Sequence, residues 1–149
     1  MYTSLRNFRT SLFAAVLAVA SFSTAMHAQT PARAKAEIPF AFQAGSSHFE
    51  AGTYTVRDLA QHIILIRSGS QSGLVMTRYE TSLNPSPSAK IVFRKYGDKY
   101  FLAELWTEGA VDHITVAKSK AEKNLSKQRN AASIAPESRI EVALLQEPK

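Results

Sequence analysis

Cysteine is absent from all 149 residues of the chain. Its absence excludes disulfide bonds, thiol catalysis and thiolate metal sites. It also excludes a lipoprotein, because lipid attachment to an exported bacterial protein requires a cysteine at the mature N-terminus.

Motifs that hold phosphates or metals are also missing. No Gly-x-Gly-x-x-Gly or Walker sequence occurs, and His48, His62 and His113 stand too far apart for the usual metal-ligand spacings. The glycine-flanked residues 69–73 come near the Gly-x-Ser-x-Gly motif of serine hydrolases, but Gln71 stands at the centre and the segment joins two predicted strands. We therefore expect no cofactor and no metal, and ordinary surface or turn histidines.

Glycoside hydrolysis needs two carboxylates that flank a sugar. The sequence offers several acidic residues without a pattern that selects a pair: Asp58, Glu80, Asp98, Glu104 and Glu108. Whether the chain is an enzyme stays open on this basis, and the sequence favours a non-enzymatic protein.

Positive charge is concentrated in one place rather than spread over the chain. The net charge is +6, but residues 29–117 hold nine basic and eight acidic side chains, whereas residues 118–129 hold five basic and one acidic. Such a local run is typical of a solvated helix, and it gives no support to nucleic-acid binding.

The N-terminus has the three parts of a bacterial export signal. Arg6 and Arg9 form a positive region, residues 12–20 are an unbroken apolar run, and small residues follow. The run is shorter than the roughly 20 residues that cross a bilayer. We predict a signal peptide at 1–28 cleaved after Ala28, with Ala25 as the alternative. The product would be periplasmic or extracellular, without a transmembrane anchor.

Cleavage after residue 28 leaves 121 residues, enough for one domain. We predict a linker at 29–36, an antiparallel β domain at 37–117, a lysine-rich helix at 118–130 and a C-terminal strand or extended tail at 131–149. In residues 37–44 the alternation of Ile38, Phe40, Phe42 and Ala44 with other residues predicts a half-buried strand. Pro39 places that strand at a sheet edge or at its beginning.

Further strands are predicted at 51–57, 62–67, 74–81 and 112–117, separated by glycine- or proline-containing connections. Seven to eight strands with one late helix indicate a mainly β fold, either an antiparallel β-sandwich or a small β-barrel.

Residues 90–107 contain a strong hairpin signal around Tyr96-Gly97-Asp98-Lys99. A three-residue loop at 97–99 would pair Tyr96 with Tyr100, whereas a two-residue loop would shift the register by one. The three-residue loop places the following residues on one face: Val92, Arg94, Tyr96, Tyr100, Leu102, Glu104 and Trp106.

Ser119 and Glu122 have the spacing of a capping box, which predicts a helix over residues 120–129. Ala121 and Leu125 form only a thin apolar stripe on it. So narrow a stripe indicates loose docking.

The chain resembles a family of small secreted bacterial β proteins to which no activity is assigned. The resemblance rests on Ile38-Pro39-Phe40-Ala41-Phe42, Ala51-Gly52-Thr53-Tyr54-Thr55-Val56, Val92-Phe93-Arg94-Lys95-Tyr96-Gly97-Asp98-Lys99-Tyr100-Phe101-Leu102 and Ser119-Lys120-Ala121-Glu122. Glu50 and Arg94 stand where such sequences often have proline and histidine. The resemblance implies a β fold and export, and it adds nothing about function.

We therefore expect an exported, non-enzymatic interaction or envelope-associated β module whose partner is an envelope component, a glycan or a protein. Its predicted contact face is the aromatic and charged side of the hairpin, namely Arg94, Tyr96, Tyr100, Glu104 and Trp106, where rings can stack on a ligand and charges can bind its polar rim. The alternative interpretation of these residues is structural: a cross-strand tyrosine pair, a core tryptophan and solvated charges.

Two other functions remain as alternatives. A small β-barrel carrier would bind an apolar ligand through a mouth lined by Phe40, Ile63 and Leu65. A glycan-active hydrolase would need two carboxylates that converge in a cleft.

Overall fold

The structure, a computed structural model, describes residues 33–69, 71–132 and 137–146. The predicted signal peptide and residues 29–32 of the predicted linker lie outside this range.

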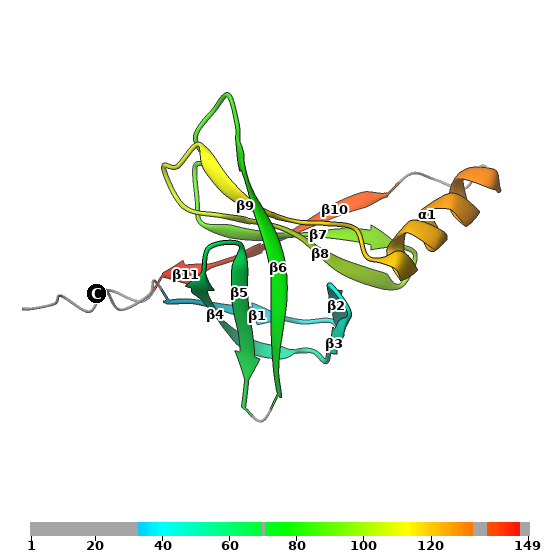
Figure 1. Cartoon of the computed structure of the whole chain (residues 1–149), viewed down its shortest axis with the longest axis horizontal. Coiled ribbons are helices and arrows are strands. Elements are labelled where there is room, and N and C mark those ends of the chain that lie inside the picture. Colours follow the sequence, from blue (N-terminus) through cyan, green and yellow to red (C-terminus); the bar gives the residue numbers. More distant parts are fainter. Residues whose placement is uncertain (1–32, 70, 133–136, 147–149) are drawn as a thin grey trace, which may run out of the picture.

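The described residues form a mainly β fold with one helix, as the sequence predicts (Figure 1). The elements follow the chain in this order: β1 (Arg33–Ile38), β2 (Phe42–Ala44), β3 (Ser47–Phe49), β4 (Gly52–Ala60), β5 (Ile63–Ser68), β6 (Gln71–Thr81), β7 (Lys90–Tyr96), β8 (Lys99–Trp106), β9 (Asp112–Val116), α1 (Lys120–Ala131), β10 (Ser138–Ala143) and β11 (Leu145–Gln146).

The strands hydrogen-bond into one open sheet in the order β10-β7-β8-β9-β6-β5-β4-β1-β11, with β2 and β3 attached beside β8. The contact of β2 with β8 is parallel, so the sheet is mixed. The predicted barrel is therefore wrong, because the sheet is not closed. The expected seven to eight strands were too few, because short strands such as β2, β3 and β11 give little alternation in the sequence.

The long strand β6 connects two leaves of this sheet, since it pairs with β5 on one side and with β9 on the other. We call β1, β4, β5 and the first half of β6 the first leaf, and the second half of β6 with β7 to β10 the second leaf. In Figure 1, β6 runs from top to bottom, with β9 beside its upper part and β5 beside its lower part. Buried side chains of both leaves share one core, for example Tyr54 and Ile64 of the first and Ile91 and Phe93 of the second.

Pro39 separates what the sequence predicts as one strand at 37–44 into two. Strand β1 begins earlier, at Arg33 within the predicted linker, and ends at Ile38; β2 begins at Phe42. Because proline has no N–H to donate, the ladder ends at Ile38. The predicted burial of alternate residues is confirmed for Ile38, Phe42 and Ala44.

The β7–β8 hairpin has a two-residue loop, the second of the two alternatives that the sequence allows. Tyr96 pairs with Lys99, and Gly97 has a φ of 63°. A glycine with positive φ at the first loop position suits a tight hairpin turn. A register shift after Val92 then restores the predicted pairing further along, with Ile91 opposite Leu105.

The predicted helix is confirmed, and it spans Lys120–Ala131. Ser119 is the N-cap, and its hydroxyl accepts a hydrogen bond from the Glu122 amide at 3.1 Å. Within the part of the chain that the structure describes, no helix is long and apolar enough to cross a membrane.

Candidate functional site

Arg94, a residue of the predicted contact face, is an internal group that holds the helix. Its Nε and Nη2 donate to the two carboxylate oxygens of Glu122 at 2.5 and 3.2 Å. Nη2 also donates to the carbonyl oxygens of Val116 at 3.1 Å and Leu102 at 3.4 Å. Arg94 therefore joins β7, β8, the end of β9 and α1.

Tyr96 connects the hairpin to Glu137, which lies in the segment after helix α1. Its hydroxyl donates to Glu137 Oε2 at 2.5 Å, and Lys118 Nζ donates to the Tyr96 hydroxyl at 2.9 Å and to Glu137 Oε2 at 2.6 Å. We call Arg94, Tyr96, Lys118, Glu122 and Glu137 the helix network. Its two basic and two acidic side chains balance one another.

The helix network shifts the pKa values of three of its members. Burial raises the pKa of Tyr96, and its hydrogen bond to Glu137 raises it further. Burial opposes the charged forms of Glu137 and Lys118, but their mutual hydrogen bond and attraction outweigh it. The pKa of Glu137 therefore lies below its ordinary value and the pKa of Lys118 lies above it.

Tyr100 does not share a face with Arg94 and Tyr96, so this part of the predicted face is wrong. The two-residue loop pairs Tyr100 with Lys95, and its ring stacks on Phe40 at a centroid distance of 4.0 Å. Phe40 in turn packs edge-on against the core residue Phe93. Tyr100 therefore belongs to the core side of the hairpin.

Glu104 and Trp106 do lie on the outer side and contact each other. Trp106 Nε1 donates to Glu104 Oε2 at 2.9 Å, and Arg139 of β10 forms an ion pair with Glu104 Oε1 at 2.9 Å. The Trp106 ring stacks on His113 of β9, with centroids 3.8 Å apart and planes at 6°. These contacts fix both the carboxylate and the indole.

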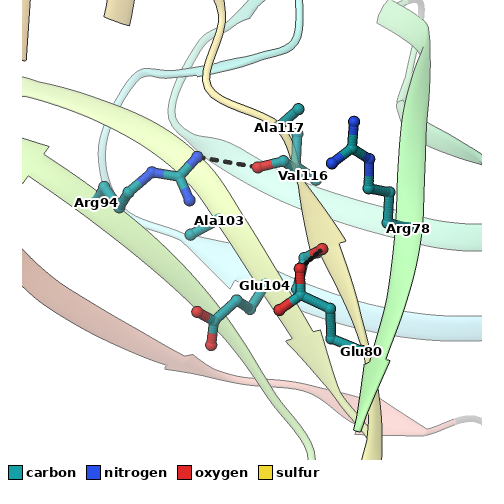
Figure 2. A pocket seen from close by; sticks show the side chains of 8 residues that line it. Arg78, Glu80, Arg94, Ala103, Glu104, Val116 and Ala117 are labelled. Carbon is teal, nitrogen blue, oxygen red and sulfur yellow. Dashed lines mark hydrogen bonds between the residues drawn. The ribbon is translucent and has the colours of Figure 1, made fainter. Parts of the chain in front are cut away.

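A small polar pocket of about 170 Å³ opens beside Glu104 on the outer side of the second leaf (Figure 2). Its lining comes from β6 to β9 and the residue after β9: Arg78, Glu80, Arg94, Ala103, Glu104, Thr115, Val116 and Ala117. Figure 2 shows Arg78 and Arg94 on either side of Val116, with the Glu80 and Glu104 carboxylates below them. Thr115 Oγ1 donates to Glu80 Oε1 at 3.1 Å. We call this the polar pocket.

The sequence interpretation missed Arg78 and Thr115 as pocket residues, and it considered Glu80 only as one of several carboxylates. The alternation in residues 74–81 already indicated that Arg78 and Glu80 share a face. Their position beside Glu104 depends on β9, which pairs with both β6 and β8. Nothing local in the sequence specifies that order of strands.

The histidines and acidic residues of the described ranges do not form a metal site: no group of three His, Cys, Asp or Glu side chains there is placed to hold an ion. His48 lies 3.4 Å from Glu50 on the surface, and His62 lies against Tyr79.

The residues expected at the mouth of a carrier do not meet. Phe40 packs onto Phe93 and Tyr100 at the core. In β5 the buried residues are Ile64 and Ile66. Ile63 and Leu65 alternate with them and therefore lie on the outer side of the strand. The structure thus brings these three side chains to no common opening.

Comparisons of the chain with protein-family models, with curated proteins and with solved structures found no match. Function is therefore inferred from the chain's own residues.

Proposed function

We propose that the protein is an exported, non-enzymatic β module that binds a polar partner, a glycan chain of the cell envelope, at the polar pocket. One observation carries this proposal: side chains of both charges from β6 and β8 and a hydroxyl from β9 converge on the solvent side of the sheet. The sequence-based prediction of export supports an envelope component as the partner.

The chemistry of the polar pocket suits a chain of hydroxyl groups. Arg78 supplies hydrogen-bond donors, and the carboxylates of Glu80 and Glu104 supply acceptors. A sugar hydroxyl both donates and accepts, so it can bind to either kind of group. Trp106, held beside Glu104 by its Nε1 hydrogen bond, adds an aromatic surface of the kind on which sugars pack.

The size of the pocket favours a contact with one part of a long partner. Its volume of about 170 Å³ is well below the roughly 300–1,000 Å³ of pockets that enclose a small ligand. A single sugar unit or side group of a polymer would enter, and the rest of the chain would run over the neighbouring strands.

A hydrolase is the second candidate, because Glu80 and Glu104 line the same pocket. A glycosidase needs one carboxyl group that carries a proton and a second that is ionised. Glu104 Oε1 forms an ion pair with Arg139, and Glu104 Oε2 accepts a hydrogen bond from the Trp106 indole. Glu80 Oε1, by contrast, accepts a hydrogen bond from Thr115. A hydrolase would divide the two roles between these two carboxyl groups.

Binding of envelope glycan fragments to the full exported chain tests the proposal, with fragments and envelope proteins offered separately. The pocket variant is R78Q/E80Q, which removes one charge of each sign from exposed positions. Its matched control is R67Q/E108Q, which makes the same chemical change at exposed positions outside the pocket. We expect the pocket variant to lose glycan binding while its melting temperature and the control's binding stay unchanged.

Equal glycan binding by wild type and R78Q/E80Q would overturn the proposed site. Capture of an envelope protein instead of glycan, sensitive to the same variant, would replace the glycan by a protein partner. Release of new reducing ends that stops in both E80Q and E104Q would establish the hydrolase.

A further inference from the structure

The outer side of the first leaf carries an apolar cluster at the β5–β6 hairpin. Strand pairing places Leu65 opposite Leu74 and Ile63 opposite Met76. Leu74 is 63% exposed and Met76 is 81% exposed, while Ile63 and Leu65 are half-buried. Side chains of this size on the solvent side of a sheet mark a surface that another molecule covers.

Basic side chains surround this cluster on the same side of the sheet. Arg57 of β4 is the cross-strand partner of Leu65, and Arg67 lies two residues after Leu65 on β5. Lys35 of β1 and Arg67 both pair with Thr55, and Arg78 follows Met76 by two residues on β6. Because alternate residues and direct partners share a face, all four cations border the cluster.

These four cations, of which Arg78 lies in the second half of β6, differ from three basic residues of β7 and β10. Lys90, Arg94 and Arg139 each form an ion pair with a glutamate. Within the described residues, Lys35, Arg57, Arg67 and Arg78 form no ion pair. The apolar residues and their direct cross-strand partners on β4, β5 and β6 form two rows across the sheet. Neither row contains an acidic residue.

Arg57 shows how a guanidinium group is accommodated at this surface. Its Nε is buried and has no hydrogen-bond partner among the described residues. Arg57 as a whole is half-buried, so the protein covers part of this guanidinium group and leaves the rest of the side chain accessible.

We propose that this apolar and basic face, formed by Ile63, Leu65, Leu74, Met76, Lys35, Arg57, Arg67 and Arg78, docks onto an anionic lipid surface. The exposed leucine and methionine enter the boundary between headgroups and acyl chains, and the surrounding cations bind lipid phosphates. The face is distinct from the polar pocket and shares only Arg78 with it. Docking therefore does not depend on the proposed glycan binding.

Charge decides between a membrane and a second copy of the chain. Two copies that meet through this face would bring Lys35, Arg57 and Arg67 of one against those of the other, and the cross-strand partners of these three cations include no acidic residue. An anionic membrane is complementary to both the apolar centre and the basic border.

Co-sedimentation of the full chain with lipid vesicles tests this inference. Vesicles that contain phosphatidylglycerol should retain the chain at low salt, and pure phosphatidylcholine vesicles should retain much less. The variants L74S/M76S and R57Q/R67Q should each lower binding roughly tenfold or more, the second by removing two cations from the surface. The matched control is K99Q/K123Q, which removes two exposed cations, one from the start of β8 and one from α1.

Three results would overturn the inference. Absence of binding to phosphatidylglycerol vesicles is the first. An equal loss in K99Q/K123Q is the second, because binding would then follow net charge alone. Self-association that disappears in L74S/M76S is the third, because it would assign the face to a second copy. Melting temperatures of all variants verify folding, and E104Q, a pocket variant outside this face, should leave vesicle binding unchanged.

Discussion

Arg94 and Glu122 form an ion pair that is buried between the β7–β8 hairpin and helix α1. Their Nε and Oε1 atoms lie 2.5 Å apart, and the two residues are 8% and 1% exposed. Glu122 is the buried residue of α1, whereas Ala121, which the sequence predicts to be part of an apolar docking stripe, is exposed. The helix thus docks mainly through charge and hydrogen bonds.

Removal of Glu122 should therefore destabilise the protein far more than removal of any exposed helix residue. In E122A the Arg94 guanidinium stays buried without its counter-charge, which costs about 3–5 kcal/mol for a buried pair. We expect a loss of that size in the free energy of unfolding, measured by urea denaturation. K123A, at the next and exposed position of α1, should change it by less than about 0.5 kcal/mol.

The double variant R94M/E122L separates the pair from its neighbours. Apolar side chains of similar length remove both charges together, so most of the stability lost in E122A should return. A double variant as unstable as E122A would show that the Arg94 hydrogen bonds to Leu102 and Val116, rather than the ion pair, hold the helix.

The sequence predicted the start of α1 but did not reveal that Glu122 binds Arg94. Ser119 caps the helix as the motif indicates, because that contact is local. The glutamate of a capping box normally reaches back to the N-cap amide. Here Arg94, 28 residues earlier in the chain, binds it instead. A tertiary contact of that separation leaves no local pattern.

The candidate site was predicted in part for the same reason. Glu104 and Trp106 lie on the outer side of the hairpin as expected, because the register shift after Val92 restores the predicted pairing in that half of β8. Tyr100 does not, because it lies between the two-residue loop and that shift. Arg78 was not identified, since its approach to Glu104 depends on β9 lying between their strands.

The N-cap contact of Ser119 should contribute measurably to the same helix. S119A removes the acceptor of the Glu122 amide, and loss of an N-cap side chain costs about 1 kcal/mol. S119D keeps an acceptor at this position and should retain nearly full stability in the same urea titration. Equal loss in both variants would contradict a capping role.

Glu137 should make the free energy of unfolding depend on pH in the acidic range. Its folded pKa lies below the ordinary 4.5 because Lys118 and Tyr96 stabilise its ionised form against the cost of burial. Its contribution is therefore present above about pH 4.5 and is lost as the pH falls through its folded pKa. In E137Q this contribution is absent at every pH. Between neutral pH and about pH 3, the free energy of unfolding should fall less steeply in E137Q than in the wild type.

Lys118 should make the free energy of unfolding depend on pH in the alkaline range. Its folded pKa is raised above 10.5, so its contribution is complete below that pH and is lost as the pH rises through the folded value. E137Q removes one cause of this shift and should make the alkaline loss smaller. Unchanged acid and alkaline slopes in E137Q would show that the Glu137 contacts have no energetic weight in solution.

Gly73 should tolerate no side chain, because Phe49 lies directly over it. A Cβ at Gly73 would stand 2.7 Å from Phe49 Cζ and 3.3 Å from Ser47 Cβ. The Phe49 ring cannot move away easily, since it is buried and stacks on Phe42 with centroids 5.0 Å apart. G73A should therefore lower the free energy of unfolding by about 1–3 kcal/mol, as overpacking of a core does.

Two further variants identify the Phe49 ring as the cause of the G73A loss. Gly52 also lies in a strand, but a Cβ there would meet its nearest atom at 3.7 Å, an ordinary contact, so G52A should be neutral within about 1 kcal/mol. F49L shortens the side chain over Gly73, so the loss caused by G73A should be smaller in the F49L background than in the wild type. Thermodynamic additivity of G73A and F49L in urea denaturation would contradict this contact, because residues that touch are expected to couple by about 0.5–3 kcal/mol.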